Sequence, residues 1–487
     1  MTAVAADRFP TQLIIGGEQM DAASGERFSV VNPATEDELA PVAKAGVADV
    51  DRAVKSARET FESAKWRNMS ARQRGALCYR LGELVHQHRD ELARLETQNN
   101  GKPIFESLID AKLTSETFKY YGGWADKIHG ETIPVDGPFL NFTLREPIGV
   151  IGAIVPWNFP MSLATWKLAP ALACGNTIVL KPAELTPYTA IRLAELALEA
   201  GFPPGAFNCI PGPGSVAGSA LVKHPGVDKI AFTGSTEVGR QIMMDAAGTL
   251  KKIQLELGGK SPNVVFADAD LDAAARGALN GIFYGKGEVC AAGSRLLVEE
   301  PVREELMGKI LERAKKMVAG DPLNPKTRLG SVVSRKQMDR VLGYIEKGKS
   351  EGAMLRHGGE RTPVNDKGYF VSPTIFDSVE RGMTIAQEEI FGPVLAVMSF
   401  EGGVEGASDL ANSTIYGLAA GIWTKDIKKA LRAAKAIQAG TVWINTYNMY
   451  DAASPFGGFK QSGFGRDLGV HALDGYMQVK SVWVDLS

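Results

Sequence analysis

Residues 150–180 read VIGAIVPWNFPMSLATWKLAPALACGNTIVL, which is an apolar run, a polar turn, a helical stretch and a second apolar run. The alternation continues as far as Leu257, with short apolar runs separated by stretches of helical periodicity. Strands that alternate with helices in this way form a parallel sheet with helices on both faces, so we expect a doubly wound α/β domain. The predicted strands are Val150–Val155, Thr177–Leu180, Asn208–Ile210, Lys229–Phe232 and Ile253–Leu257, and the predicted helices are Ser162–Ala173, Tyr188–Glu199, Ser215–Val222 and Val238–Ala247.

The chain on either side of this segment predicts further structure. Residues 48–98 carry helix formers with apolar side chains three and four positions apart. A second mixed α/β region extends from about Lys260 to Gly458. Leu140–Arg145 and Ser481–Asp485 alternate apolar and polar residues, which is typical of half-exposed strands. Because single cores stop growing at about 250–300 residues, a chain of 487 residues should form more than one lobe.

The composition argues against several classes of protein. A net charge of −2 does not favour nucleic acid or an anionic membrane over a small-molecule partner. No apolar run approaches the ~20 residues that span a bilayer, and the opening MTAVAADRFPTQ lacks the pattern of a secretory signal. The 4 cysteines include no CxxC pair, and the 6 histidines have no metal-binding spacing. We expect a cytoplasmic protein with a small-molecule substrate, no metal and no disulfide framework.

Connections in the parallel region carry residues that suit a nucleotide. In residues 232–239, FTGSTEVG, glycine and free N–H groups at a helix start favour a phosphate, although a helix N-cap explains the same residues. Lys181 and Glu184 follow the second strand, at the edge where open α/β sheets bind ligands. Glu184 could accept hydrogen bonds from ribose hydroxyls and would repel a 2′-phosphate, which favours NAD over NADP; a surface ion pair is the alternative. Residues 210–214, IPGPG, suit a loop under the adenine or a simple turn.

Three further side chains suit chemistry at a carbonyl carbon. Glu256 ends an apolar strand beside Gly258 and Gly259, where a carboxylate can swing and act as a general base. Cys290 has small neighbours that leave room for a substrate, and a cysteine thiolate is a strong nucleophile. The amide of Asn158 could stabilise an oxyanion. Each has an ordinary structural alternative. Glu256 could be a solvent-exposed acid on a strand, Cys290 a small buried apolar residue, and Asn158 part of a turn before a helix.

Taken together, these motifs resemble those of the aldehyde dehydrogenase superfamily, in that family's order, from about Leu13 to Val484. Residues 120–124 (YYGGW) and 454–458 (SPFGG) most resemble its retinal and acetaldehyde branch. The motifs are PWNFP at 156–160, KPAE at 181–184, FTGSTEVG at 232–239, LELGGKSP at 255–262, GEVC at 287–290, EEIFGPV at 388–394 and SPFGGFKQSG at 454–463.

The resemblance implies a domain organisation and an assembly. A Rossmann-like NAD-binding domain is expected at residues 1–125 and 148–259, and a catalytic α/β domain at 260–458. Residues 126–147 and 459–487 are expected to form a small β lobe that mediates oligomerisation. The implied partners are an aldehyde and further copies of the chain, in a homodimer or homotetramer.

The resemblance also implies roles for individual residues. Cys290 would attack the aldehyde, Asn158 and the Cys290 N–H would hold the oxyanion, Glu256 would activate the hydrolytic water, and Lys167 would belong to a proton relay. The implied NAD-binding residues are Ile154, Trp157, Lys181, Glu184, Gly214, Gly234, Ser235, Gly239, Leu257, Glu389 and Phe391. The implied substrate tunnel is lined by Leu113, Phe159, Leu163, Trp166, Val289, Ala291, Tyr450 and Phe456, whose apolar character favours a hydrophobic or aromatic aldehyde.

Three positions depart from the family pattern. Lys286 and Glu288 stand where uncharged residues are usual, and two charges near the nucleophile could shift its pKa in opposite senses. Asp467 stands where a relay glutamate is usual, which would shorten the relay. Two other functions share the scaffold. A thiol esterase or CoA-acylating enzyme would use the same acyl-cysteine, but Glu256 argues for hydrolysis, and a non-catalytic structural protein would not need Cys290, Glu256 and Asn158.

Overall fold

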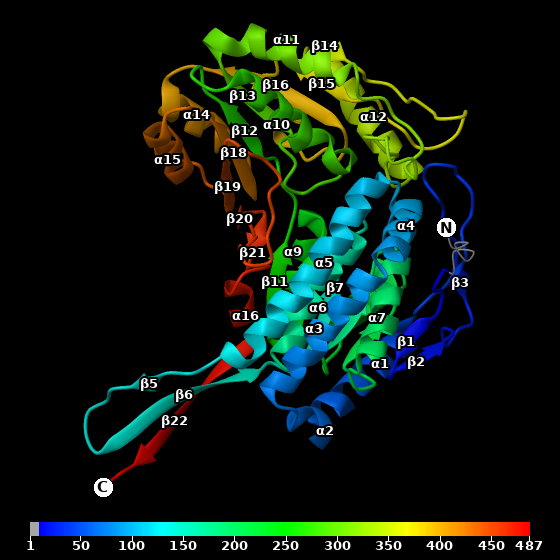
Figure 1. Cartoon of the computed structure of the whole chain (residues 1–487), viewed down its shortest axis with the longest axis vertical. Helices are drawn as coiled ribbons and strands as arrows, with labels where there is room; N and C mark the ends of the chain where they lie inside the picture. Colours follow the sequence, from blue (N-terminus) through cyan, green and yellow to red (C-terminus); the bar gives the residue numbers. More distant parts are fainter. Residues whose placement is uncertain (1–8) are drawn as a thin grey trace.

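The computed structural model describes residues 9–487, and its two large sheets lie in separate bodies with a β arm extending from one of them (Figure 1). Residues 1–8, on which the prediction about a secretory signal largely rests, lie outside the described residues. No helix in residues 9–487 is long and apolar enough to cross a membrane.

The first body contains an eight-stranded sheet in the order β2-β1-β9-β8-β7-β10-β11-β21. Strands β9, β8, β7, β10 and β11 are mutually parallel, so the prediction of a parallel α/β sheet is confirmed. The strand order reverses direction between β7 and β10, and ligands of open α/β sheets bind outside the carboxyl ends at such a point. The bounds are β1 Leu13–Ile15, β2 Glu18–Met20, β7 Val150–Ile154, β8 Thr177–Lys181, β9 Phe207–Cys209, β10 Lys229–Thr233, β11 Lys252–Glu256 and β21 Gly463–Phe464.

Helices cover this sheet and mostly match the predicted ranges. One predicted helix has the expected bounds but a different geometry, because Ser215–Val222 is not a continuous α-helix. Instead, a π-helical turn at Gly214–Gly218 precedes a short α8, because the N–H groups of residues 216, 217 and 218 all donate to the carbonyl of Pro213. The helices of this body are α1 Val47–Glu62, α2 Ala64–Arg67, α3 Ala71–Gln87, α4 Arg89–Asn100, α5 Ile104–Trp124, α6 Pro160–Ala173, α7 Tyr188–Ala200, α8 Ser219–Lys223 and α9 Thr236–Ala246.

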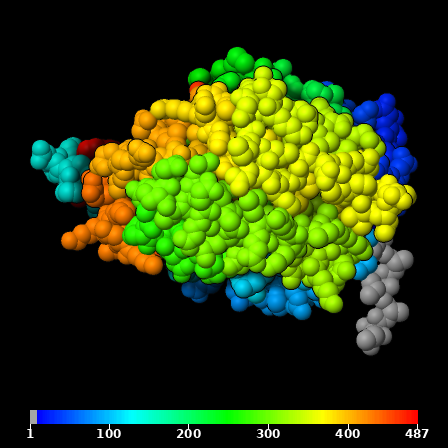
Figure 2. Space-filling model, turned by 90° about the horizontal axis from the view of Figure 1, so that it is seen from above, coloured from blue at the N-terminus to red at the C-terminus, as the bar shows by residue number. Residues whose placement is uncertain are grey.

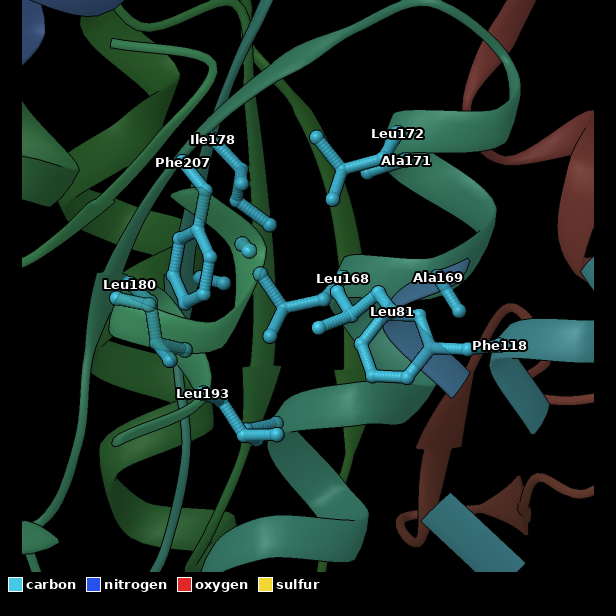
Figure 3. Close-up of a cluster of buried hydrophobic side chains, with 14 of the residues drawn as sticks. Leu81, Phe118, Leu168, Ala169, Ala171, Leu172, Ile178, Leu180, Leu193 and Phe207 are labelled. Atoms are coloured by element: carbon cyan, nitrogen blue, oxygen red, sulfur yellow. The ribbon is translucent and has the colours of Figure 1, made fainter. Parts of the chain in front are cut away.

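Apolar packing fixes α6, the helix that carries Lys167, against the sheet. Figure 3 shows Leu168 of α6 among side chains from β8 and from the helices α3, α5 and α7. Leu168 and its neighbours Leu81 and Phe118 have no exposed surface. A buried leucine of this kind stabilises the fold by about 2–5 kcal/mol relative to alanine, so the frame around the sheet edge is rigid.

The second body contains a seven-stranded sheet in the order β14-β15-β16-β13-β12-β18-β19, parallel except at β14. Figure 2 shows it from above, where the green to orange part of the chain covers most of the face. Its strands are β12 Pro262–Val265, β13 Arg295–Glu299, β14 Met354–His357, β15 Thr374–Asp377, β16 Val394–Phe400, β18 Ala419–Trp423 and β19 Thr441–Ile444, and its main helices are α10 Leu271–Phe283, α11 Arg303–Ala314, α12 Arg335–Ser350, α14 Gly403–Ala411 and α15 Ile427–Ala436.

The arm is a three-stranded antiparallel sheet that projects from the first body and carries the C-terminus (Figure 1). Its strands are β5 Thr132–Ile133, β6 Phe139–Pro147 and β22 Met477–Asp485, and the last two contain both strands that were predicted here. They pair with each other along their length. Within residues 9–487, the other edge of β22 has no partner strand. Residues 463–464 lie in the sheet of the first body rather than in the arm.

Candidate active site

Two cavities meet at Cys290, between the two bodies. The larger has a volume of about 510 Å³ and the smaller about 50 Å³, and Cys290 is the residue that their linings share. The larger is lined by Pro156, Trp157, Asn158, Leu185, Thr233, Gly234, Ser235, Leu257, Gly258, Cys290, Val333, Ser334, Lys336, Gln337, Arg340, Glu389 and Phe391. The smaller is lined by Asp110, Leu113, Phe159, Ser162, Leu163, Trp166, Tyr284, Val289, Cys290, Tyr450 and Phe456.

Cys290 is the cysteine whose surroundings suit reaction. It lies on the loop between α10 and β13 and is half-buried, whereas Cys78, Cys174 and Cys209 are fully enclosed. Gly259 lets this loop approach closely, because a Cβ there would lie 2.2 Å from the Cys290 carbonyl oxygen. Burial raises the pKa of the Cys290 thiol, and the carboxylates of Glu256 and Glu389 raise it further. The resting sulfur is therefore a thiol, and a nearby positive charge would favour the thiolate.

Asn158 lies between β7 and α6 and lines the larger cavity near Cys290. Its Nδ2 donates to the carbonyl oxygen of Glu288 at 2.9 Å, which uses one of its two hydrogens. The side chain is 4% exposed, and its Oδ1 has no hydrogen-bond partner among the described residues. The remaining Nδ2 hydrogen can serve an oxygen bound beside Cys290.

Glu256 ends β11 and is 2% exposed, which excludes the alternative of a solvent-exposed strand acid. Neither carboxyl oxygen has a well-formed hydrogen bond in residues 9–487, and a weak one from the backbone N–H of Gly458 lowers the pKa of Glu256 only slightly. Burial and the charge of Asp467 raise its pKa well above the ordinary value. Glu256 lines neither cavity, but it lies in electrostatic range of the Cys290 sulfur. A Cβ on Gly457 would lie 2.7 Å from Oε1, so this glycine makes room for the carboxylate.

A buried polar network lies beside Glu256. The Nζ of Lys167 forms an ion pair with Oδ2 of Asp467, and both side chains are completely buried. The other carboxyl oxygen of Asp467 accepts a hydrogen bond from Nε2 of Gln254 at 2.7 Å. The aspartate therefore reaches the lysine directly, even though its side chain is one methylene shorter than that of a glutamate.

The connection after β10 suits a dinucleotide. Gly234 and Ser235 line the larger cavity at the start of the 11-residue helix α9, with the hydroxyl of Ser235 accepting from the N–H of Val238 at 3.3 Å. The buried hydroxyl of Thr233 lines the same cavity and has no partner in the described part of the chain. Helix N-termini favour phosphate groups, and the cavity volume is in the range of ligand sites, so the residues present fit NAD.

Gly239 contributes by packing rather than by lining the cavity. A Cβ at Gly239 would lie 2.6 Å from Cδ2 of Leu257, so the glycine lets α9 approach Leu257, which does line the cavity.

Besides Gly239, four predicted cofactor residues lie nearby but outside the lining of the larger cavity: Ile154, Lys181, Glu184 and Gly214. They gather at the carboxyl ends of β7, β8 and β9, where Oε2 of Glu184 accepts from the N–H of Gly214 at 3.3 Å. The Nζ of Lys181 donates to the carbonyls of Pro182 and Gly212, and burial lowers its pKa to about 8.

Glu389 and Phe391 form the opposite wall of the larger cavity. Oε1 of Glu389 accepts from the N–H of Gly259 at 2.9 Å, and burial raises its pKa to about 7. The Phe391 ring meets the Trp157 ring edge to face, with centroids 5.1 Å apart.

Sequence reasoning missed the contribution of α12 to this wall. Ser334, Lys336, Gln337 and Arg340 line the larger cavity. Gln337 donates to the carbonyl of Phe391 at 2.6 Å and Arg340 to that of Glu389 at 2.9 Å. The sequence around α12 carries no glycine-rich turn and no strand end, so the only available signal was a cluster of polar and basic residues.

The smaller cavity has apolar and aromatic walls. The Trp166 and Phe456 rings lie with centroids 5.4 Å apart, and Tyr450 and Phe456 5.7 Å apart. Of the predicted tunnel residues, Ala291 does not line the cavity, because its side chain is fully buried in the loop. Asp110, Ser162 and Tyr284 line it and were not predicted. In residues 9–487, no three His, Cys, Asp or Glu side chains gather so as to hold a metal ion.

Comparisons with known proteins agree with this geometry. The model of the aldehyde dehydrogenase family matches residues 20–482. Human retinal dehydrogenase 2 is 49% identical over 98% of this chain and 92% of its own. The NAD+ complex of an aldehyde dehydrogenase from Bacillus cereus is 49% identical with a TM-score of 0.96, covering 98% of this chain and 97% of that chain. Indole-3-acetaldehyde dehydrogenase from P. syringae, solved with NAD+ and IAA, is 46% identical with a TM-score of 0.97, at 98% and 97% coverage. The chain therefore belongs to the aldehyde dehydrogenase family and is an NAD-dependent oxidoreductase.

Proposed function

We propose that this enzyme oxidises a hydrophobic or aromatic aldehyde to its carboxylic acid through a thiohemiacetal and a thioester on Cys290. The observation that carries the proposal is that Cys290 is shared by a large cavity of nucleotide size and a small apolar one. A thiol at that junction can bond to an aldehyde carbon while the carbon faces a hydride acceptor.

The first half-reaction forms the thioester. The Cys290 thiol first loses its proton to solvent through the larger cavity, and the thiolate then bonds to the aldehyde carbon. The second Nδ2 hydrogen of Asn158, together with the Cys290 N–H, stabilises the resulting oxyanion. NAD bound in the larger cavity supplies the hydride acceptor and a cationic ring that favours the thiolate. Loss of hydride from the thiohemiacetal carbon leaves a thioester. The residues assigned to hold NAD are those implied by the family resemblance, to which we add Thr233, Gln337 and Arg340 because they line the cavity.

The second half-reaction hydrolyses the thioester. We assign Glu256 as the base that removes a proton from water, because burial and Asp467 raise its pKa and so make its carboxylate a strong base. The absence of a side chain at Gly457 leaves space beside Oε1 of this carboxylate. The buried Lys167–Asp467 pair then serves to relay protons away from Glu256.

The proposed substrate class rests on the wall of the smaller cavity. Its lining is mostly aliphatic and aromatic, which favours an apolar aldehyde over a strongly hydrated one. A relative named for indole-3-acetaldehyde supports an aromatic substrate. The test is kcat/KM across short aliphatic, long aliphatic, aromatic and cationic aldehydes, with NADH absorbance as the signal. Higher kcat/KM for the cationic set than for the aromatic and long aliphatic sets would contradict the assignment.

The covalent step is tested by Cys290→Ala, with Cys174→Ala as the matched control at an enclosed cysteine. We expect the Cys290 variant to lose dehydrogenase activity and still bind NAD, as followed by fluorescence titration, and the control to stay active. Turnover by a correctly folded Cys290 variant would exclude the mechanism. NADH formation that depends on CoA, with an acyl-CoA product, would instead support the acylating alternative. If no aldehyde gave NADH, the result would support a structural role.

We also propose a cytoplasmic homodimer or homotetramer assembled through the arm. Large apolar side chains are exposed along it, including Leu140 at 40% and Trp483 at 59%. Sheet edges and apolar faces of this kind are usually covered in natural proteins. A second copy of the arm would cover both.

A further inference from the structure

The loop that leads to Cys290 has an unusual backbone. Gly285, Lys286 and Gly287 have φ angles of +57°, +61° and +73°, all in the left-handed region. Glycine adopts this region freely, and at Gly287 a Cβ would lie 2.1 Å from the carbonyl oxygen of Gly392. Lysine adopts it only where other contacts hold it there. The contacts of Lys286 are therefore informative about what the loop is built to do.

The side chain of Lys286 is 1% exposed, and its ammonium group has three partners. Nζ donates to Oδ1 of Asn100 at 2.6 Å and to the carbonyl of Asn100 at 3.1 Å. It also lies 2.9 Å from Oε2 of Glu288 in an ion pair whose side chains are both buried. A lysine in a strained conformation thus joins the end of α4 to the loop of the nucleophile.

Glu288 holds two further parts of the site. Its Oε1 accepts from the backbone N–H of Val333 at 3.0 Å, and Val333 lines the larger cavity. Its backbone carbonyl accepts from Nδ2 of Asn158, the amide assigned to the oxyanion. Glu288 is also two residues before Cys290 in the chain, so its position fixes where the sulfur and the amide lie relative to each other.

Asn100 closes these contacts into a ring. Its Nδ2 donates to the carbonyl of Trp157 at 2.8 Å and lies 3.4 Å from that of Asn158. The ring runs from Lys286 to Asn100, through the backbone at residues 157–158 to the Asn158 amide, and back through Glu288 to Lys286. Both the backbone and the side chain of Asn158 are held by members of this ring.

We propose that the buried Lys286–Glu288 pair is a positioning pair that sets the Asn158 amide against the sulfur of Cys290. This inference rests on the proposed roles of Asn158 and Cys290. Neither Lys286 nor Glu288 lines the smaller cavity or touches the reacting atoms, so the pair acts on the rate of thioester formation through geometry. It should affect aldehyde binding and NAD binding little.

The two charges are predicted to be energetically coupled. Loss of the lysine leaves the Glu288 carboxylate buried with only the weaker attraction of Lys102, whereas removal of both charges of the pair can be nearly neutral. The variant Lys286→Met leaves a buried carboxylate and frees Asn100. Glu288→Gln keeps an acceptor for the Val333 N–H and for Lys286, so it is the conservative change. The double variant removes the stranded charge.

The experiment measures the rate constant of the NADH burst by stopped flow at saturating aldehyde and NAD. Outright loss of an oxyanion donor costs roughly 10²–10³ in rate, so we expect misplacement in Lys286→Met to slow the burst by at least about tenfold. Glu288→Gln should change it by less than about threefold. The double variant should recover only part of the loss, because it removes the stranded carboxylate but leaves the ring open. NAD affinity and aldehyde KM should stay within about threefold. Lys316→Met with Glu312→Gln, an exposed pair with side chains 72% and 73% accessible, is the control and should have no effect.

A purely structural role would lower the melting temperature or the burst amplitude without changing the burst rate constant. An unchanged rate constant in folded Lys286→Met, or simple additivity in the double variant, would overturn the inference. Should Lys286→Met not fold, Asn100→Ala opens the same ring without removing either charge. An unchanged burst rate constant in that variant would likewise overturn the inference. Absence of a burst in the unaltered enzyme would count against the proposed function instead.

Discussion

The sharpest test of the two-step chemistry is Glu256→Gln, which keeps the shape of the side chain and removes its basicity. The carboxylate is buried, and the amide oxygen can keep its weak contact with the backbone N–H of Gly458, so the substitution breaks no strong hydrogen bond. Effects on rate should therefore reflect the lost base rather than a rearranged site. We expect the variant to form the thioester and then to hydrolyse it slowly.

The expected magnitude follows from the surroundings of Glu256. General acid–base catalysis contributes about 10²–10⁴ in rate, and it is most effective when the pKa of the base lies near the working pH. Burial and the charge of Asp467 raise the pKa of Glu256 from its ordinary value, which moves it towards the working pH. We therefore expect loss in the upper half of the range, about 10³–10⁴ in the hydrolysis rate, or roughly 4–5.5 kcal/mol of barrier.

Thioester formation should survive for an electrostatic reason. The charge of Glu256 is one of the causes that raise the pKa of the Cys290 thiol. A neutral glutamine lowers that pKa, so the thiolate becomes easier to form. The NADH burst should consequently be as fast in the variant as in the unaltered enzyme, or faster.

The assay is stopped-flow NADH absorbance under enzyme excess and under multiple turnover. The expected trace is a full burst of one NADH per active site followed by very slow turnover, and mass spectrometry of the quenched enzyme should find an acyl adduct on Cys290. Glu304→Gln, on α11, is a matched control at a carboxylate whose side chain is 76% exposed. A lost burst would mean that Glu256 acts before hydride transfer, and unchanged steady turnover would remove it from the mechanism.

Three further outcomes are expected. Glu184→Ser should reduce the ratio of kcat/KM for NAD to that for NADP by roughly three- to tenfold, a small factor because the side chain is exposed. Equal kcat/KM for both cofactors in the unaltered enzyme would refute the assignment. Asp467→Asn removes a charge that raises the pKa of Glu256, so this pKa should fall. The hydrolysis rate should then rise with pH at a lower pH than in the unaltered enzyme, and a move to higher pH would contradict the proposed effect of Asp467 on Glu256. Deletion of residues 480–487 removes most of β22 and should shift the mass measured by light scattering towards that of a monomer. If the intact chain were already monomeric at micromolar concentration, the proposed assembly through the arm would be refuted.

Local patterns predicted the parallel sheet well. The apolar runs around Val150 and Thr177 are short, bounded by turns and followed by helical periodicity, and each became a buried strand. The same reasoning failed at residues 214–218, because hydrogen bonds converging on the carbonyl of Pro213 widen that turn. Side-chain periodicity carries no information about such backbone bonding.

The site was predictable only where motifs mark it. Cys290, Asn158 and Ser235 stand in short, recognisable stretches, and all three line the larger cavity. Gln337 and Arg340 lie on an ordinary amphipathic helix, and their place in the wall depends on how the second body packs against the first. The contact of Lys286 with Asn100 likewise depends on tertiary structure, because the two residues are 186 positions apart in the chain.

The hydrolytic machinery and the substrate cavity share one support, which is visible only in three dimensions. Phe456 lines the smaller cavity, and its backbone exchanges two hydrogen bonds with Asp467, at 2.7 and 2.8 Å. Asp467 in turn holds Lys167 and accepts from Gln254. Because side chains alternate along a strand, Gln254 and Glu256 project from the same face of β11. The strand that carries the proposed base therefore also carries the amide that bonds Asp467, and the wall of the proposed aldehyde site is tied to the charge that raises the pKa of that base.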